Sequence, residues 1–284
     1  MKYKLIEPII PQELDVVNRV LTNRGIPLED VEHYLQTCAD DVIDPSCIAR
    51  IKDGAQLLIQ HLVNQDKIFI LIDSDADGYT SAALLINYLN VLFPGLTQNN
   101  IKYGYHEGKG HGLSDIISWL VSQDFKLVIC PDSSSNDYDE HKLCYDNGID
   151  VLVIDHHEAD QISPYACVIN NQLCDYPTKS LSGAGMVYKF CCYLDKILQT
   201  NEAYNFIDLA AIGMVADMMD IRDFETKELI TEGITHLYNP FIKEMINSNS
   251  VMINRAGGLT PHTIGFYIAP FINAVTRVGT LEEK

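Results

Sequence analysis

Residues 67–78, which read KIFILIDSDADG, decide the fold. Residues 68–72 form an unbroken apolar run of strand length, typical of a parallel strand that is buried on both faces of its sheet. Aspartates follow it at positions 73, 75 and 77, and a helix is expected from about residue 79 to residue 92. A buried strand, an acidic turn and a helix in this order predict the first unit of an α/β fold.

The same alternation continues along the chain. Further strands are expected at residues 101–105, 126–130 and 150–154, and helices at residues 113–121, 138–146, 186–198, 204–219 and 226–237. Strands that alternate with helices predict a mostly parallel, doubly wound sheet with helices on both faces. We expect residues 67–240 to form this α/β domain.

The flanking segments have a different pattern. Residues 1–66 are predicted to be a helical segment packed on the α/β domain, with apolar residues at helical spacing in residues 12–22, 29–35 and 47–63. Residues 241–284 are expected to form a helical connector toward a second domain. The histidines on predicted helices, His33, His61, His141 and His236, are expected at the surface.

Composition limits the class of protein. The chain has 284 residues, 20 Lys and Arg against 39 Asp and Glu, and a net charge of −19, which excludes a basic nucleic-acid binder. The start, MKYKLIEPIIPQEL, lacks the apolar stretch of a signal peptide, and no run has the ~18 apolar residues of a membrane helix. The 8 cysteines are dispersed. We therefore expect a cytoplasmic, monomeric protein with reduced thiols and no contact with a membrane.

Acidic residues and histidines follow three of the predicted strands. Asp73, Asp75 and Asp77 follow the first, Asp132 follows the third, and Asp155-His156-His157 end the fourth. Because ligands bind at the carboxyl ends of parallel strands, these groups should meet in one crevice. Asp217 lies in an apolar helix, where burial of an acid is costly unless the acid is paired or binds a metal.

Crowded carboxylates repel each other and need a counter-charge. Aspartates with one or two imidazoles suit Mn²⁺ or Mg²⁺ better than Zn²⁺, and a carboxylate shared by two ions ~3.5–4 Å apart is typical of phosphoryl transfer. A calcium EF-hand is a poor alternative, because position 12 counted from Asp73 is Leu84 and not Glu. An ordinary capped turn remains an alternative reading of the first motif alone.

Two loops between the acidic clusters contain polar residues. Residues 133–135 are three serines, which form either a turn or a source of hydroxyl and amide groups near a phosphate. Residues 107–112 read EGKGHG, and His111 there is expected to be a loop or substrate residue rather than a metal ligand.

These residues resemble the motifs of the DHH phosphoesterase superfamily, and specifically of its RecJ-type single-strand exonucleases. Residues 73–78, 131–137, 155–157 and 215–217 are similar to its successive motifs, and the similarity continues in residues 170–185 and 258–277. The RecJ-type exit segment reads P-R-x-N-A-A-G-R, whereas this chain has PFINAVTR, with Phe271 in place of a cation. The Gly-rich second domain and any OB-type DNA-binding domain of the family are not found, so we expect a fragment or a short variant.

The resemblance implies a site for two ions, Mn²⁺ or Mg²⁺. Its expected ligands are Asp73, Asp75, Asp77, Asp132, His156 and Asp217. Asp132 would bridge the ions, His157 would face the scissile phosphate, and Asp155 would orient a ligand. The expected substrate contacts are Ser133, Ser134, Lys109, His111, Gly183, Asn273 and Arg277.

The implied activity is 5′→3′ degradation of single-stranded DNA by a two-metal hydroxide mechanism, in repair or recombination. One alternative is a phosphodiesterase for short oligonucleotides or cyclic dinucleotides. The other is a catalytically weak scaffold with a replication or repair partner, although a scaffold has no need for six costly ligands. Because part of the −19 charge would face the two ions, the acidity does not exclude a phosphate substrate, but it predicts weak, salt-sensitive DNA binding.

Overall fold

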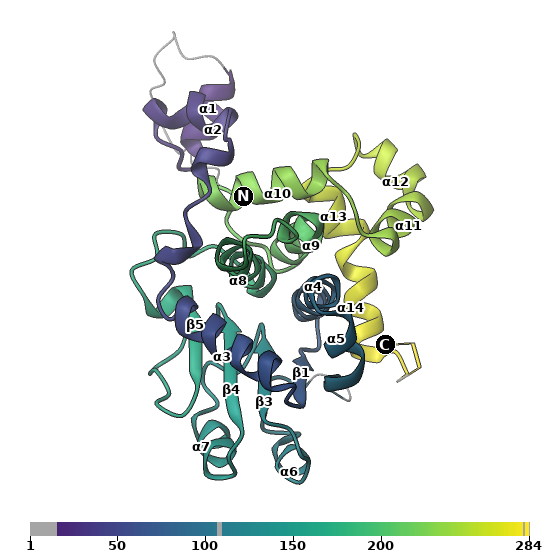
Figure 1. Cartoon of the computed structure of the whole chain (residues 1–284). Coiled ribbons are helices and arrows are strands. Elements are labelled where there is room, and N and C mark those ends of the chain that lie inside the picture. Colours follow the sequence, from purple (N-terminus) through teal and green to yellow (C-terminus); the bar gives the residue numbers. More distant parts are fainter. Residues whose placement is uncertain (1–15, 107–109, 281, 284) are drawn as a thin grey trace, which may run out of the picture.

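Five parallel strands form the centre of the computed structural model, which describes residues 16–106, 110–280 and 282–283. The strands are β1 (Ile68–Ile72), β2 (Ile101–Tyr105), β3 (Leu127–Pro131), β4 (Asp150–Asp155) and β5 (Cys167–Asn170). Their order in the sheet is β2-β1-β3-β4-β5, and every neighbouring pair is parallel (Figure 1). The chain order reverses between β1 and β3, and open α/β sheets bind their ligands at such a point.

Helices cover both faces of the sheet, as predicted. One face packs against α3 (Ile51–Asn64), α4 (Ala76–Leu92) and α8 (Gly183–Leu198), and α9 (Ile207–Ala216) packs on the outer side of α4 and α8. The other packs against the shorter α6 (Ile117–Leu120) and α7 (Tyr138–Asp146). In β1, Ile68 and Ile70 join the core on the first face and Phe69 and Leu71 join the core on the second, because successive side chains point to opposite faces.

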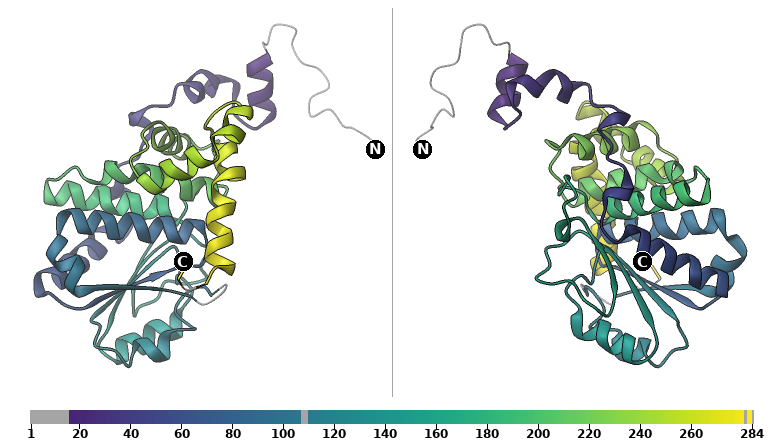
Figure 2. Two further views of the ribbon diagram at one scale, coloured as in Figure 1. Left: turned by 90° about the vertical axis from the view of Figure 1, so that its right-hand side faces the viewer. Right: turned by 60° about the vertical axis from the view of Figure 1, so that its left-hand side comes forward.

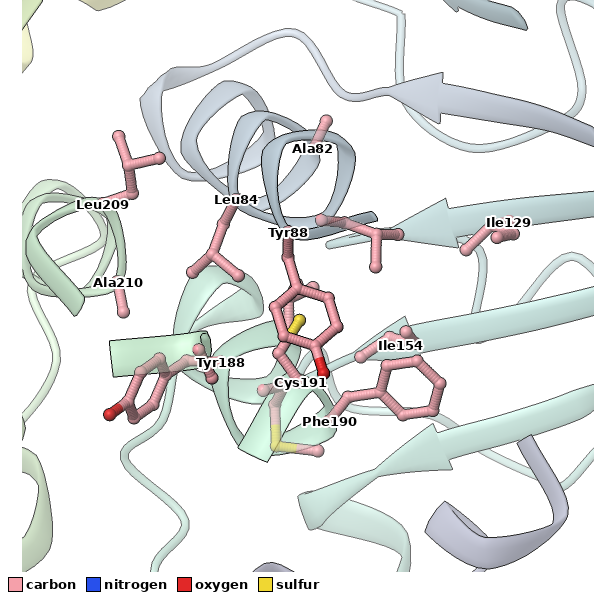
Figure 3. Close-up of a cluster of buried hydrophobic side chains, with 14 of the residues drawn as sticks. Ala82, Leu84, Tyr88, Ile129, Ile154, Tyr188, Phe190, Cys191, Leu209 and Ala210 are labelled. Carbon is pink, nitrogen blue, oxygen red and sulfur yellow. The ribbon is translucent and has the colours of Figure 1, made fainter. Parts of the chain in front are cut away.

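The larger core lies between the sheet and the pair α4 and α8. Figure 3 shows Tyr88 of α4 pointing toward Phe190 and Cys191 of α8, with Ile129 of β3 and Ile154 of β4 beside them. All five side chains are completely buried, which fixes α4 and α8 against the sheet.

The terminal segments pack on the outer helices. Among the described N-terminal residues, α1 (Val16–Asn23) and α2 (Val31–Leu35) lie away from the sheet, and their small core includes Phe224 of α10 (Phe224–Thr235). The C-terminal segment is helical, as predicted, with α11 (Pro240–Ser248), α12 (Ser250–Arg255), α13 (Pro261–Tyr267) and α14 (Ala269–Val278). Figure 2 shows α14 running beside α4 toward the sheet.

The sequence prediction differs from the structure in three elements. The strand β5 was not predicted, because it has only four residues and ends in a polar Asn170. The third N-terminal helix begins at Ile51 and not at residue 47, since a 3-10 turn and a left-handed Arg50 (φ 62°) precede it. A short α5 (Pro94–Asn100) was also missed, and residues 12–15 of the first predicted helix lie outside the described residues.

No helix within the described ranges is long and apolar enough to span a bilayer. The eight cysteines are all free thiols, as expected.

Two of the four histidines expected at the surface are buried instead. His61 is 5% exposed and lies between carboxylates, with Nδ1 2.9 Å from Asp66 and Nε2 3.1 Å from Asp150. His141 is fully buried, and neither ring nitrogen has a hydrogen-bond partner among the described residues. The helical spacing could not reveal this, because α7 turns the His141 face toward the sheet.

The buried His141 predicts a loss of stability in mild acid. Burial lowers the pKa of His141 from 6.5 to about 4, so between these values the unfolded chain binds a proton that the folded chain excludes. Protonation therefore favours unfolding as the pH falls from 6.5 to 4. Replacing the ring by an apolar side chain, His141→Leu, should reduce the stability lost between pH 7.5 and pH 5 by about 2 kcal/mol, measured by urea unfolding. The exposed control His262→Gln should lose as much stability between pH 7.5 and pH 5 as the wild type. If His141→Leu also has the pH dependence of the wild type, the prediction is wrong.

Candidate metal centre

The predicted acidic residues meet at the carboxyl edge of the sheet. Asp73 follows β1 directly, Asp75 caps α4, Asp132 follows β3, and Asp155 is the last residue of β4. Asp217 reaches the same place from the C-terminal end of α9. The crevice lies where the strand order reverses, which is the expected ligand position for this topology.

The side chains form two neighbouring groups of candidate ligands. Within each group, atoms that could bind a metal lie within 4.8 Å of one another, and the groups are Asp73, Asp75 and Asp132, and Asp77, His156 and Asp217. A third group of this kind, Asp132, Asp155, His156 and His157, overlaps both of them. His156 links the two, because its Nε2 is 3.3 Å from Oδ1 of Asp132, 3.5 Å from Oδ2 of Asp217 and 3.8 Å from Oδ2 of Asp77.

Several buried polar atoms of this cluster make no hydrogen bond with a described residue, and two of them face each other at 3.3 Å. Asp132 is 2% exposed and His156 is 8% exposed, yet Asp132 Oδ1 and His156 Nε2 make no hydrogen bond with any described residue. Most buried polar side-chain atoms in proteins have a hydrogen-bond partner, and an unsatisfied one indicates a missing water or ion. Carboxylates with an imidazole and no thiolate suit Mn²⁺ or Mg²⁺, so the residues fit such an ion.

Local backbone structure places these side chains. Asp132 has a left-handed φ of 64°, which turns the chain sharply away from β3. Asp77 is fixed by the start of α8, where it accepts hydrogen bonds from Ser182 Oγ (2.7 Å) and from the backbone N–H groups of Gly183 (2.7 Å) and Ala184 (3.1 Å). A helix N-terminus binds a carboxylate through its free N–H groups, so the start of α8 fixes the position of the Asp77 side chain.

Burial and the charges of neighbouring groups shift the pKa values of the side chains in the cluster. Burial, followed by the charges of Asp77 and Asp155, raises the pKa of Asp132 well above its usual range. Burial and the charge of Asp77 raise the pKa of Asp217 to about 7, and burial lowers the pKa of His156. Burial favours the neutral form of all three groups, and for the two aspartates the repulsion of neighbouring carboxylates acts in the same direction.

A second pair lies beside this cluster. His157 Nδ1 is 2.7 Å from Oδ1 of Asp155, and this hydrogen bond raises the pKa of His157 to about 9. Burial opposes ionisation of Asp155, but its hydrogen bonds with His157 and Ser135 hold its pKa below the usual range. Asn170 donates to the His157 carbonyl (2.9 Å). His157 is therefore a fixed cation at neutral pH, with Nε2 as its second donor.

The predicted substrate residues fall into different environments. Lys109 lies outside the described residues. His111 is 3.0 Å from Oδ1 of Asp73, and its ring packs edge-on against His157 at 5.0 Å. Ser133 and Ser134 are buried. Asn273 and Arg277 contact the loop that contains Asp75, and Gly183 contacts Asp77 as described above.

Sequence reasoning missed several residues that support the site. They are Asn170, Ser182, Ala184 and Thr276. Only Ser182 had a local signal, because it precedes a Gly-rich helix start where a capping serine is common. The others act through contacts between distant segments, which spacing does not show.

The close approach of Gly183 to Asp132 gives a prediction. A Cβ atom at Gly183 would lie 2.3 Å from both Cβ and Oδ1 of Asp132, so either α8 or the buried carboxylate must move. We expect Gly183→Ala to lower the free energy of unfolding by about 1–3 kcal/mol. The control is Gly265→Ala in α13, whose Cβ would have an ordinary 3.7 Å contact with Val215. Equal stabilities of the two variants in urea unfolding would contradict this packing.

Comparison with known proteins gives the family of this fold and site. The model described as the DHH family, N-terminal domain, matches residues 67–214. The chain belongs to the DHH family. The match contains the aspartates after β1 and β3 and the DHH residues 155–157, but it ends before Asp217, which the geometry adds to the cluster.

Two curated relatives and two solved structures illustrate the similarity. A Bacillus subtilis SPbeta prophage protein named as a single-strand DNA-specific exonuclease, YorK, is 39% identical over 100% of this chain and 48% of its own length. The single-stranded-DNA-specific exonuclease RecJ of Bacillus subtilis is 30% identical over 93% of this chain and 33% of its own length. The chain thus spans about half the length of YorK and a third of RecJ.

The structures show the DHH fold. Exonuclease RecJ bound to manganese has a TM-score of 0.69 at 23% identity, covering 83% of this chain and 59% of that chain. RecJ from Thermus thermophilus in complex with Mn²⁺ has a TM-score of 0.66 at 23% identity, covering 93% of this chain and 39% of that chain. The predicted α/β architecture is therefore confirmed.

Proposed function

We propose that this chain carries the catalytic site of a metal-dependent phosphodiester hydrolase that degrades single-stranded DNA from its 5′ end. The observation that carries the proposal is the convergence of buried carboxylates on His156 Nε2, which lies 3.3 Å from Asp132 Oδ1 while neither atom makes a hydrogen bond with a described residue. The names of YorK and RecJ support single-stranded DNA as the substrate, and the RecJ structures with Mn²⁺ and Mg²⁺ support the choice of ion.

The ligand groups divide naturally between two ions. Asp73, Asp75 and Asp132 would hold the first. Asp77, His156 and Asp217 would hold the second, and Asp132 can serve both because its Oδ1 is 3.3 Å from His156 Nε2. Bound divalent ions would activate water as a nucleophile and offset the charge that develops on the phosphate.

The residues of the chain supply orientation and positive charge. His157 is held by Asp155, remains protonated at neutral pH, and can donate from Nε2 to a phosphate or leaving-group oxygen. Asp155 is fixed in turn by the backbone N–H groups of Ser135 (3.1 Å) and His156 (2.7 Å). This pair gives the acidic crevice a cation that does not depend on the ions.

The experiment uses the chain with Mn²⁺ or Mg²⁺ and single strands labelled at the 5′ or the 3′ end. The proposal expects release of labelled mononucleotides from the 5′ label first, no activity with EDTA, and little activity on duplex DNA. Faster turnover of dinucleotides or cyclic dinucleotides than of long strands would show that these short molecules, and not long single strands, are the substrate. No hydrolysis of any of these substrates with either ion would overturn the proposed function.

A further inference from the structure

The C-terminal helix α14 contacts the loop between β1 and α4, about 200 residues earlier in the chain (Figures 1 and 2). Oδ1 of Asn273 accepts a hydrogen bond from the backbone N–H of Ala76 at 2.9 Å. Oγ1 of Thr276 has two carbonyl acceptors at 3.2 Å, that of Ser74 in the loop and that of Asn273 within α14. Both contacts are made to peptide groups, so they act on the path of the loop backbone.

These two contacts lie on either side of one candidate ligand. Ser74 precedes Asp75 and Ala76 follows it, so α14 holds the peptide groups on both sides of Asp75. Asp75 has an extended backbone, and its Oδ1 caps α4 by accepting from the N–H of Gly78 at 3.0 Å. With Oδ1 engaged, the direction of Oδ2 depends on where the loop backbone lies.

Other groups cannot easily replace these two contacts of the loop. The first N–H groups of a helix have no partner within the helix, and that of Ala76 is satisfied only by Asn273 among the described contacts. Thr276 is 1% exposed, so water does not readily replace its hydroxyl. The guanidinium of Arg277 is 3.7 Å from Oδ2 of Asp75, which places a cation beside the same carboxylate.

We propose that Asn273 and Thr276 are positioning residues, which set the direction of the Asp75 carboxylate toward the first ion. The inference rests on the proposed function for the identity of that ion. It differs from the role expected from the sequence, in which Asn273 would contact the substrate directly. In the second group, Asp77 is held by the start of α8, His156 follows β4 and Asp217 ends α9, and none of the described hydrogen bonds joins these residues to α14. We therefore expect α14 to act on the first ion.

The test compares isosteric variants of α14 that lack each hydrogen bond. Asn273→Leu removes the acceptor and Thr276→Val removes the donor, whereas Thr276→Ser keeps the hydroxyl. Val278→Ala is the helix control, because Val278 is 82% exposed. Binding of Mn²⁺ alone is measured by calorimetry, and amide hydrogen exchange of residues 73–79 is measured in the metal-free proteins.

We expect the wild type, Thr276→Ser and Val278→Ala to bind two Mn²⁺ ions with similar affinities. Asn273→Leu and Thr276→Val should lower the affinity for one Mn²⁺ ion by about tenfold and leave the affinity for the other unchanged. A loss of this size is typical when a residue that supports a metal ligand is removed. Exchange of the 73–79 amides should be faster in both variants.

Three results separate the possible failures. Unchanged Mn²⁺ binding with unchanged exchange in Asn273→Leu and Thr276→Val would overturn the positioning role. An equal loss of affinity for both ions, together with a lower melting temperature, would also overturn the positioning role, because this result indicates a general structural role. A wild type that binds two Mn²⁺ ions but cleaves no DNA refutes the proposed function alone, and the binding and exchange comparison still decides the role of α14.

Discussion

The Asp132→Asn variant is expected to lose hydrolytic activity by at least about a thousandfold while keeping its fold. Asp132 is the residue that both ligand groups need, since it belongs to the first group and lies 3.3 Å from His156 of the second. Asparagine has the same shape and tolerates the left-handed φ of 64° at this position, so the backbone turn after β3 should remain. The loss therefore reports on the carboxylate and not on the fold.

Without metal, Asp132→Asn should be the more stable protein at alkaline pH. Burial and neighbouring carboxylates raise the pKa of Asp132, so the folded chain keeps a proton that the unfolded chain releases as the pH rises. The contribution of Asp132 to the stability of the metal-free wild type should therefore be lost as the pH rises, and Asp132→Asn should not show this loss. Thermal melts between pH 5 and pH 9 and the Mn²⁺-dependent rate measure both effects.

The matched control for Asp132→Asn is Asp53→Asn on α3, whose side chain is 62% exposed and away from the crevice. It should retain the rate and the pH dependence of the wild type. Retention of more than about a tenth of the wild-type rate in Asp132→Asn would exclude Asp132 as the shared ligand.

The largest loss of stability is expected for Lys189→Met, at about 3–5 kcal/mol. Lys189 and Glu225 form an ion pair at 2.6 Å, and each side chain is 1% exposed. Removal of the ammonium leaves the buried carboxylate of Glu225 without its counter-charge, which costs more than the pair itself contributes.

This ion pair joins four separate segments of the chain. Lys189 of α8 also donates to the carbonyl of Ile43, whose N–H donates to Glu225 of α10 at 3.1 Å, and Tyr176 donates to Glu225 at 2.7 Å. Loss of the pair should therefore loosen the N-terminal segment from the α/β domain. We expect urea unfolding to show the loss for Lys189→Met and a partial recovery for the double variant Lys189→Met/Glu225→Gln. A loss below about 1 kcal/mol would contradict the buried pair.

The central strands could be predicted because their signal is local. Residues 68–72 and 151–154 are apolar runs that must be buried on both faces, and the acids after them follow the general rule for the carboxyl edge of a parallel sheet. The grouping of Asp73, Asp132 and His156 followed from that rule before any distance was known.

The remaining features depend on contacts between distant residues. The short β5 pairs only with β4, and its four residues carry no pattern of their own. The burial of His141 depends on which face of α7 meets the sheet. The contacts of Asn273 and Thr276 depend on α14 returning to the start of α4, and no spacing in the sequence indicates this return.

The central claim is that this crevice binds two ions that share Asp132. The most direct measurement is anomalous diffraction at the manganese edge from crystals of the protein soaked with Mn²⁺. The account predicts two peaks ~3.5–4 Å apart. One should lie among Asp73, Asp75 and Asp132, and the other among Asp77, His156 and Asp217. No peak in the crevice, or a single ion that does not contact Asp132, would contradict the account.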